Sequence, residues 1–446
     1  MNKTVFRNPR SQIIPVKENF YLALNPGVNN GIKILNEQQV AVLREMDGQT
    51  SIEEIVNATG YPTEVIVQLL DIFGEIELIG YSPDFTEPQL PTEARNIDFW
   101  VHTTDACNFN CPYCYIDKTK NKSIRDDVLE KFIQKIVTLV EKRNLAEISL
   151  RFSGGEPLLR FHQVKEAILK IKSELKSRDC KTNIGFLTNL TLLNQEIVSF
   201  IQQENLYTSI SLDGFGVFHD KTRHFKNNRG SFHIVDKNIN TLLEAGHSRI
   251  IIMTVISNRN LDGLPELAHY LAKKNIPFRF SIVTGEEIDQ AKLKKKLFEV
   301  YDIFERYIKD SSYAFARNHH LDDLRFLSPS YRPCSAGFMS GGLYTDGKIY
   351  FCQQELGNGE DSGSVFDETD LIQNIQTKQH RHTQLHDDCE SCSYRYVCSG
   401  GCPLYRINGK SPHCGLYKEL LPRIYQLIGL ERYYRLKQAN RKVKAE

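Results

Sequence analysis

Residues 107–114 read Cys-Asn-Phe-Asn-Cys-Pro-Tyr-Cys, and we interpret the rest of the chain from this stretch. It places three thiols within eight residues, in the spacing C-x3-C-x2-C. Thiolates this close together chelate a metal centre better than they form disulfides, and iron–sulfur clusters bind a Cys thiolate at each iron. A four-iron cluster held by three cysteines keeps one iron open. Structural zinc is the alternative, but it usually takes four protein ligands, and no fourth Cys or His follows nearby.

With the aromatic Tyr113 before the last cysteine, this spacing resembles the signature of the radical SAM superfamily. The resemblance implies that Cys107, Cys111 and Cys114 hold a [4Fe–4S] cluster whose open iron binds S-adenosylmethionine. One electron from the reduced cluster then cleaves this cofactor to a 5′-deoxyadenosyl radical, which abstracts hydrogen from a substrate. In such enzymes the protein supplies binding, orientation and exclusion of water.

The whole chain bounds the class of protein. Its 446 residues suggest about three domains, and 41% hydrophobic and 25% charged residues are ordinary for a soluble globular protein. The net charge of +1 gives no case for nucleic acid or a membrane as main partner. We see no membrane-spanning run and no secretion signal, and therefore expect a cytoplasmic protein. There, eleven cysteines indicate metal rather than disulfides.

Residues 1–81 have the pattern of a small α+β module. Two strand-like runs, 20–24 and 31–35, are separated by turn residues. Three amphipathic helices follow, with Asn36 capping the first, Ser51 starting the second and Thr63 starting the third. This order predicts a winged-helix-like module. The third helix carries no Lys or Arg, which argues against DNA reading.

This module resembles the PqqD-like peptide-recognition domains of ribosomal-peptide maturation. The match is Ile34-Leu35-Asn36 before the first helix, Asp47-Gly48 at its end, and the run 51–55. The resemblance implies that the leader of a precursor peptide adds as a strand to the small sheet and packs against the third helix. A purely structural cap is the alternative. Residues 82–95, with three prolines among polar residues, form a linker.

From residue 96 to 322 strands and helices alternate. The six candidate strands are 97–103, 146–152, 183–188, 207–212, 249–257 and 278–283. This pattern predicts a parallel sheet curled into a partial (β/α)6 barrel. Active sites of such folds lie at the C-terminal ends of the strands, and the Cys cluster directly follows the first strand. His319 and His320 are expected in a polar loop.

Polar residues also follow later strands. Gly154 and Gly155 let the backbone approach a ligand, and Glu156 can accept from an ammonium group. The resemblance implies that residues at these strand ends bind S-adenosylmethionine: Tyr113, Gly154, Gly155 and Glu156; Asn189 at the ribose, although Leu190 stands where the family often has Gly; Ser211 with either Arg223 or Arg229 at the carboxylate; and Val255 at the adenine. The catalytic base stays unassigned, with Asp213 and Glu355 as weak candidates.

Residues 323–436 hold the second metal region, with seven Cys within 81 residues. Zinc ribbons are the alternative. The intervals resemble the SPASM extension, a Cys-rich Fe–S domain that holds auxiliary [4Fe–4S] clusters. The resemblance implies one fully ligated cluster on Cys389, Cys392, Cys398 and Cys414, and a second on Cys334, Cys352 and Cys402 whose fourth ligand is not a Cys. A helix from Leu416 to about Arg435 is expected to dock on the barrel, before a basic tail at 437–446.

Together these resemblances indicate a radical SAM/SPASM peptide maturase. It would use three [4Fe–4S] clusters, S-adenosylmethionine and an electron donor such as flavodoxin or ferredoxin to install a thioether, C–C or C–O cross-link in a precursor peptide. One alternative is an anaerobic sulfatase-maturase-like enzyme. That family has a basic Asp directly after the Cys equivalent to Cys352, whereas Gln353 stands here and cannot act as a base. The other alternative is a non-catalytic Fe–S protein that binds leader peptides.

Overall fold

The computed structural model describes residues 4–85, 87, 92–322, 324–382 and 385–443. At its centre is a ten-stranded sheet, whose strands in chain order are β7 (Asn96–His102), β8 (Glu147–Ser153), β9 (Lys181–Thr188), β10 (Tyr207–Ser211), β11 (Ile250–Ile256), β12 (Phe278–Ile282), β13 (His319–Leu321), β14 (Ser340–Leu343), β15 (Lys348–Tyr350) and β16 (Asp361–Ser364). Across the sheet the order is β13-β12-β11-β10-β9-β8-β7-β14-β15-β16. The pairs from β13 to β14 are parallel, and the last two pairs are antiparallel. The predicted mixed α/β fold with a parallel sheet is therefore confirmed.

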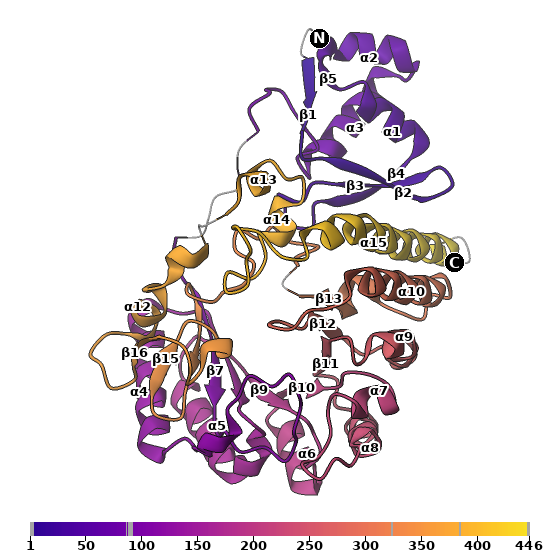
Figure 1. Ribbon diagram of the computed structural model, residues 1–446. Helices are drawn as coiled ribbons and strands as arrows, with labels where there is room; N and C mark the ends of the chain where they lie inside the picture. The colour runs from indigo at the N-terminus through magenta and orange to yellow at the C-terminus, as the bar shows by residue number, and fades with distance from the viewer. Residues whose placement is uncertain (1–3, 86, 88–91, 323, 383–384, 444–446) are drawn as a thin grey trace.

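Helices cover the outer side of this curved sheet (Figure 1). They are α4 (Asp126–Arg143), α5 (Phe161–Leu175), α6 (Gln195–Gln203), α7 (Val217–Asp220), α8 (Phe232–Glu244), α9 (Leu264–Lys274), α10 (Gln290–Lys309) and α11 (Phe315–Asn318). Apolar residues at helical spacing form their inner faces. In α4, for example, Phe132 is fully buried and its ring centroid lies 5.5 Å from that of Phe99 in β7. The concave side of the sheet is therefore not covered by these helices, and we expect the active site there.

Four strands of the sheet, β13 to β16, were not expected. His319 begins β13, is buried, and stacks on Phe315 with 4.7 Å between ring centroids, so the polar loop predicted there is wrong. The glycine-rich β14 pairs with β7, and a Cβ on its Gly341 would lie 2.6 Å from the side chain of Ile375. Strands from both sides of the domain boundary predicted after residue 322, β13 and β14, therefore belong to one sheet.

The N-terminal residues form a separate module above the barrel (Figure 1). Its elements are β1 (Thr4–Arg7), β2 (Gln12–Lys17), β3 (Phe20–Leu24), β4 (Ile32–Asn36), α1 (Glu37–Arg44), β5 (Asp47–Ser51), α2 (Ile52–Thr59), α3 (Thr63–Gly74) and β6 (Ile79–Gly80). They make the sheets β5-β1-β6 and β2-β3-β4. Asn36 and Ser51 each form a capping box, as their positions predicted.

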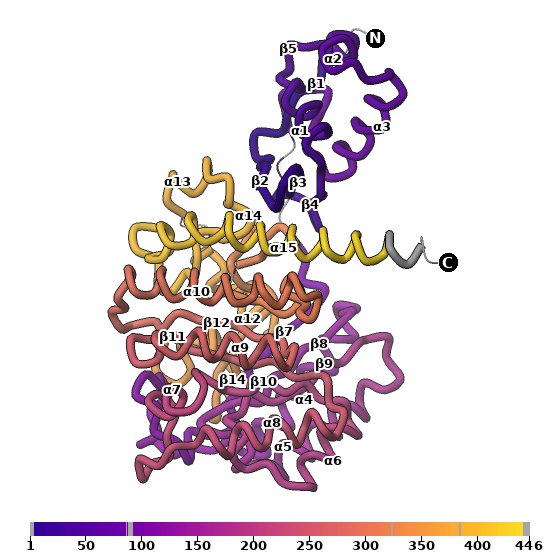
Figure 2. The backbone as a smooth tube through the Cα atoms, turned by 90° about the vertical axis from the view of Figure 1, so that its right-hand side faces the viewer, coloured from indigo at the N-terminus to yellow at the C-terminus, as the bar shows by residue number. Residues whose placement is uncertain are grey.

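The remaining helices belong to the Cys-rich region: α12 (Leu371–Gln376), α13 (Asp387–Glu390), α14 (Arg395–Cys398) and α15 (Cys414–Val443). The long α15 lies between the N-terminal module and α10 (Figures 1 and 2). It approaches β2 closely, because a Cβ on Gly429 would lie 2.5 Å from Val16. Arg432 donates to the carbonyl of Ile32 at 2.9 Å. Helix α15 also continues to Val443, so residues 437–443 of the predicted tail are helical.

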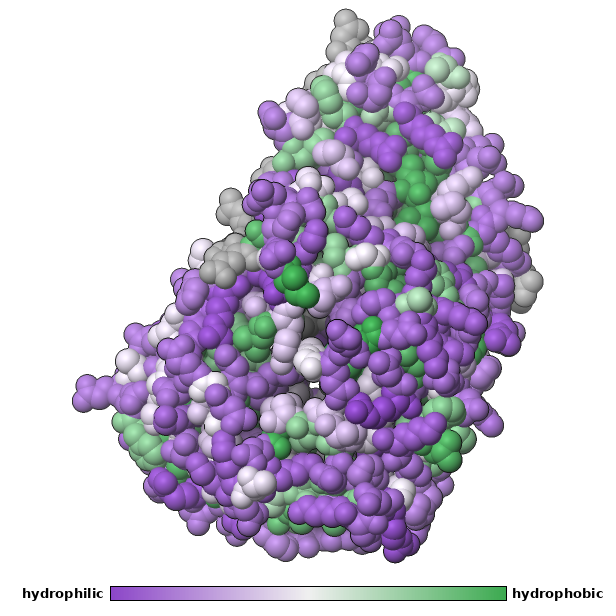
Figure 3. Space-filling view, viewed as in Figure 1, coloured by the Kyte–Doolittle hydropathy of each residue, from purple (hydrophilic) through white to green (hydrophobic). Residues whose placement is uncertain are grey.

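The face shown in Figure 3 is largely hydrophilic and is hollowed near its centre. Among the described residues, no helix is both long and apolar enough to span a membrane.

Candidate active site

The loop after β7 carries the cysteines of residues 107–114. Cys107 is buried, and its sulfur accepts a hydrogen bond from the N–H of Phe109 at 3.4 Å. Cys111 and Cys114 are half-buried, and the N–H of Cys114 donates to the carbonyl of Cys111 at 3.2 Å. Burial raises the pKa of Cys107 to about 11, and it also raises the pKa of Cys111. Thiolates in this position need a positive partner, so the residues present fit an iron–sulfur cluster.

The two glycines after β8 make room for this loop. The N–H of Gly155 donates to the carbonyl of Thr104 at 2.6 Å, and that of Glu156 to the carbonyl of Ala106 at 2.9 Å. A Cβ on Gly155 would lie 2.2 Å from the Ala106 oxygen. Gly154 has φ +151°, and a Cβ there would lie 2.5 Å from the Thr104 oxygen. The backbone that approaches these glycines is thus that of the cysteine loop.

Glu156 is buried at the ends of β8 and β9. One carboxylate oxygen accepts from the hydroxyl of Thr188 at 2.6 Å and the N–H of Leu158 at 3.1 Å, and the other from the N–H of Asn189 at 2.8 Å. Burial raises the pKa of Glu156 to about 7. The Asn189 amide in turn donates to the side chain of Asn108 at 2.8 Å. The structure therefore brings two predicted residues, Glu156 and Asn189, together against the cysteine loop.

Asp213 follows β10, is buried, and contacts Arg223, Tyr113 and Val255. Its carboxylate lies 3.0 Å from Nε of Arg223. That N–H is not aligned for a hydrogen bond, so the contact is an ion pair. The carboxylate also accepts from the hydroxyl of Tyr113 and from the N–H of Val255, the latter at 2.9 Å. With both oxygens occupied, Asp213 is better placed to position Tyr113 and Arg223 than to accept a substrate proton.

Of the two arginines that the sequence left open, the structure places Arg223 at the site. Its side chain is 13% exposed, and its guanidinium carbon lies 5.5 Å from the centre of the Tyr113 ring. The positive charge of Arg223 lowers the pKa of both Cys111 and Glu156, whereas burial raises it. Arg229 is exposed on the surface. Ser211, the other residue predicted for the carboxylate, is buried at the end of β10.

A buried polar group that the sequence did not reveal ties the cysteine loop to the Cys-rich region. Asp105 lies 2.8 Å from Nε2 of His102 and accepts from the hydroxyl of Tyr344, after β14, at 2.9 Å. It also accepts from the N–H of Lys122 at 3.2 Å. His102, Asp105 and Tyr344 are all almost fully buried. The group fixes the start of the loop against the strand pair that leads to Cys352.

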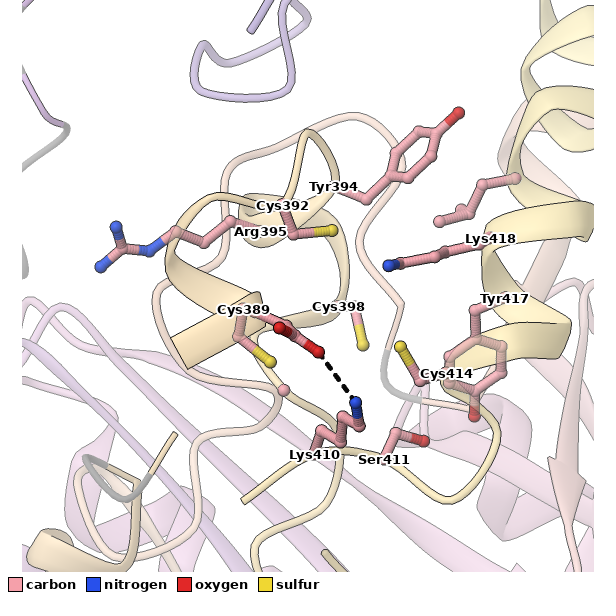
Figure 4. Close-up of a pocket in the computed structure, with 13 residues that line it drawn as sticks. Cys389, Cys392, Tyr394, Arg395, Cys398, Lys410, Ser411, Cys414, Tyr417 and Lys418 are labelled. Carbon is pink, nitrogen blue, oxygen red and sulfur yellow. Dashed lines mark hydrogen bonds and ion pairs between the residues drawn. The ribbon is translucent and has the colours of Figure 1, made fainter. Parts of the chain in front are cut away.

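Four of the predicted auxiliary ligands line one pocket: Cys389, Cys392, Cys398 and Cys414. They come from α13, the segment after it, α14 and the start of α15, and their sulfurs point into shared space (Figure 4). Burial raises the pKa of Cys398 to about 12, and the other three thiols act in the same direction. Within the described chain no three His, Cys, Asp or Glu side chains are arranged to hold one metal ion. The thiol set fits a cluster, which places one sulfur on each iron.

The other predicted set is Cys334, Cys352 and Cys402, and all three of these thiols are half-buried. Burial raises the pKa of Tyr405, and the nearby Cys402 and Cys352 act in the same direction. Burial lowers the pKa of Arg406, against the charges of Cys389, Cys402, Cys398 and Cys334, so Arg406 lies near thiols of both sets. The Cys352 thiol also donates to the side chain of Gln353 at 3.2 Å. No disulfide joins any of the eleven cysteines, all of which lie within the described residues.

Tyr115 lies between the two cysteine regions. Its side chain is partly exposed, at 42%. Desolvation by the surrounding protein raises its pKa, and the charges of Cys352 and Cys114 act in the same direction. Tyr405 lies on the same side and donates to the side chain of Gln354 at 2.7 Å. Tyr115 follows Cys114 directly, so its position in the sequence could have indicated a role, whereas Tyr405 carried no such signal.

Glu355, the second weak candidate for a base, is ion-paired. Both of its carboxylate oxygens lie near Nη1 of Arg381, at 2.9 and 3.0 Å. The pair secures the turn that follows Cys352.

Residues 101–271 match the family model of the Radical SAM superfamily. The match includes the loop with Cys107, Cys111 and Cys114 and the strands β8–β11. The match supports a radical SAM domain in this stretch, and this class of oxidoreductase implies a [4Fe–4S] cluster and S-adenosylmethionine.

The chain is similar in sequence to one set of proteins and in structure to another. A cysteine-type anaerobic sulfatase-maturating enzyme of Clostridium novyi is 26% identical over 318 residues, which are 66% of this chain and 84% of the relative. The structure of native anSMEcpe with bound AdoMet has a TM-score of 0.63 at 17% identity, over 75% of this chain and 99% of that chain. Streptococcus suis SuiB bound to precursor peptide SuiA has a TM-score of 0.52 at 16% identity, over 90% and 95%.

Proposed function

We propose that this protein is a radical SAM maturase that cross-links a ribosomally made precursor peptide. The observation that carries the proposal is that Cys389, Cys392, Cys398 and Cys414 line one pocket. They follow the residues that match the radical SAM model in the chain. The likeness to SuiB, which was solved with its precursor peptide, spans 90% of this chain, whereas that to anSMEcpe spans 75%. The wider match supports a role for the N-terminal module in binding the precursor peptide.

Each group of side chains in the site would have its own role. When bound, the first cluster and S-adenosylmethionine supply a 5′-deoxyadenosyl radical that abstracts hydrogen from the peptide. Glu156 would hold the ammonium group of the cofactor, and Arg223, with Ser211, its carboxylate. Tyr115 and Tyr405 would orient the peptide next to Cys352. Closing a thioether, C–C or C–O bond removes one hydrogen atom, one proton and one electron, and the Cys-rich region would accept that electron.

The iron content tests the number of clusters. Three four-iron clusters require about 12 iron and about 12 sulfide per chain after anaerobic reconstitution. Zinc with little sulfide would contradict the assignment. The Cys398→Ala variant should lose about four of these irons, because Cys398 is one of the four proposed ligands of one cluster.

The edge strand β4 and helix α3 form the place proposed for the leader peptide. Lys33 of β4 and Glu75, just after α3, form an ion pair at 2.6 Å, which brings the two elements together. On α3, Val65 and Ile72 are two helical turns apart and share the face that leads to Glu75. Val65 is 36% exposed. A leader that adds to β4 would pack on this face.

The chain offers a matched pair of substitutions for this site. Val67 is 37% exposed, but it points about 200° away from Val65 around α3. Val65→Asp should weaken precursor binding at least about tenfold, because a charge would be desolvated at the interface. Val67→Asp should leave it unchanged, and peptide-free cleavage of S-adenosylmethionine should persist in both variants. Equal affinities for the two variants, measured by fluorescence anisotropy of a labelled leader, would remove the leader assignment.

A sulfatase-maturase-like activity is the second candidate, favoured by the similarity to the Clostridium novyi enzyme. Gln353, which accepts from Cys352, stands where that family has its basic Asp. A short sulfatase-type peptide without a leader distinguishes the two candidates. We expect it to stay unmodified in mass spectra, and its conversion would favour the second candidate.

A further inference from the structure

Two segments that are distant in the sequence meet on the outside of the cysteine loop. The backbones of Phe109 and Phe225 form an antiparallel bridge, and their rings pack edge to face with centroids 5.1 Å apart. On either side, the N–H of Asn110 donates to the carbonyl of His224 at 3.0 Å. The N–H of Lys226 donates to the carbonyl of Asn108 at 3.2 Å. The segment 221–233 is thus fastened directly onto the loop that carries Cys107.

This place is strongly cationic, although the whole chain has a net charge of only +1. Residues 221–233 contain four Lys or Arg and no Asp or Glu. Arg223 forms the ion pair with the buried Asp213, which leaves Lys221, Lys226 and Arg229 as the cations of this segment. A pocket is lined by Asn108, Phe225, Lys226, Asn227, Arg229, Gly230, His233 and Ile234. Lys226, Arg229 and His233 are exposed around it, and we call these three residues the Lys226 surface. Among the described residues, no ion pair involves the side chain of Lys226 or Arg229.

The carboxylate that precedes this segment does not neutralise the surface. Asp220 accepts from the backbone N–H groups of Ser231 and Phe232, at 2.7 and 2.9 Å. Its charge is therefore used inside the fold, where it shapes the start of α8. On the loop side, Lys118 adds another cation and donates to the carbonyl of Phe109 at 3.0 Å.

The Lys226 surface also lies beside the cluster site. Asn108, which lines its pocket, is covalently bonded to the ligand Cys107. Only one residue therefore separates this surface from a sulfur of the first cluster. An electron that reduces this cluster must enter from outside the chain, and transfer rates fall steeply with distance.

We infer that the Lys226 surface is the docking site for a small acidic electron-carrier protein that reduces the first cluster. This inference rests on the proposed function. The carrier loses one electron and the cluster gains it, with no bond made or broken. Complementary charge would steer the carrier to this face and speed encounter, which suits a weak and short-lived complex. Electron-transfer complexes of this kind bury little surface and depend on salt.

A charge reversal at Lys226 tests the inference in the full-length, reconstituted enzyme. Lys226→Glu keeps the backbone hydrogen bond to Asn108 and changes only the surface charge. We expect it to lower the initial rate of 5′-deoxyadenosine formation driven by limiting reduced flavodoxin about tenfold at low salt. The loss should shrink in 0.5 M salt, because salt screens exposed charges. With dithionite, a small reductant, the rate should equal that of the wild type.

Lys295→Glu provides the matched control, because Lys295 is an exposed lysine on α10. It should leave the flavodoxin-driven rate unchanged. Equal flavodoxin-driven rates for Lys226→Glu and the wild type at low salt would overturn the docking assignment. An equal loss with flavodoxin and dithionite would also overturn it, since the surface would then serve the chemistry itself. If the wild type forms no 5′-deoxyadenosine even with dithionite, the proposed function fails, and the inference fails with it.

Discussion

Asp105 lies two residues before Cys107 and receives hydrogen bonds from a strand, a loop and the Cys-rich region. Its carboxylate is shared by His102, Tyr344 and the N–H of Lys122. These partners lower the pKa of Asp105 against the effect of burial. Tyr344 is 239 residues away in the chain, so no local pattern could have revealed the contact. Glu156, by contrast, was predictable, because it belongs to a short motif directly after a strand.

Tyr344→Phe should destabilise the protein by about 1–3 kcal/mol, because it leaves the buried Asp105 carboxylate with one donor fewer. Urea unfolding of the anaerobic protein measures this change. Tyr313→Phe is the control, since the Tyr313 hydroxyl is buried without a hydrogen-bond partner among the described residues. Removing that hydroxyl should be neutral or stabilising. If both variants lose the same stability, Tyr344 contributes only its ring.

His219 predicts a dependence of stability on pH. Its Nδ1 accepts from the N–H of Asp213 at 3.2 Å, so the proton sits on Nε2, which donates to the Ser231 hydroxyl at 3.0 Å. Burial lowers the pKa of His219 from 6.5 to about 4. Between these values the unfolded chain binds a proton that the folded chain does not. The free energy of unfolding should therefore fall with falling pH, by up to about 1.4 kcal/mol per unit.

His219→Gln should remove this share of the pH dependence, which urea titrations at pH 7 and pH 5 can measure. The exposed His162→Gln variant should keep the wild-type difference between the two pH values. An unchanged difference in His219→Gln would show that His219 does not cause it.

At the scale of elements, the strands of the barrel were predictable to within two or three residues. Parallel strands buried on both faces give short apolar runs, as in β11, and these runs stand out from the amphipathic helices between them. The strand β14 reads Ser-Gly-Gly-Leu and carries no such signal. Its glycines are explained only by close contacts with Ile375 and Leu356, which come later in the chain.

Gly155→Ala tests how the second strand end supports the cysteine loop. The added methyl group would lie 2.2 Å from the Ala106 carbonyl, so the loop has to move. We expect the reconstituted variant to hold about four iron fewer per chain. Gly74→Ala is the control, because a Cβ there meets nothing within 4 Å. Full iron content in Gly155→Ala would show that the loop can shift without losing its cluster.

At the scale of the whole molecule, α15 links parts that the sequence suggested as separate domains. It begins at Cys414, a ligand proposed for the auxiliary cluster, and later packs on both α10 and the sheet β2-β3-β4. The aromatic contact of Phe20 with Tyr433, 4.8 Å between centroids, belongs to this junction. The sequence predicted that this helix docks on the barrel, but it did not predict the contact with the N-terminal sheet, because long-range packing leaves no periodic signal.

The central claim is that the cysteines of residues 107–114 generate the radical, and the Cys111→Ala variant tests it most directly. Wild-type protein, reconstituted anaerobically and given S-adenosylmethionine and dithionite, should form 5′-deoxyadenosine, which liquid chromatography with mass spectrometry detects. The variant should retain about eight iron on its auxiliary sites and form none. Continued formation of 5′-deoxyadenosine by Cys111→Ala would contradict the account.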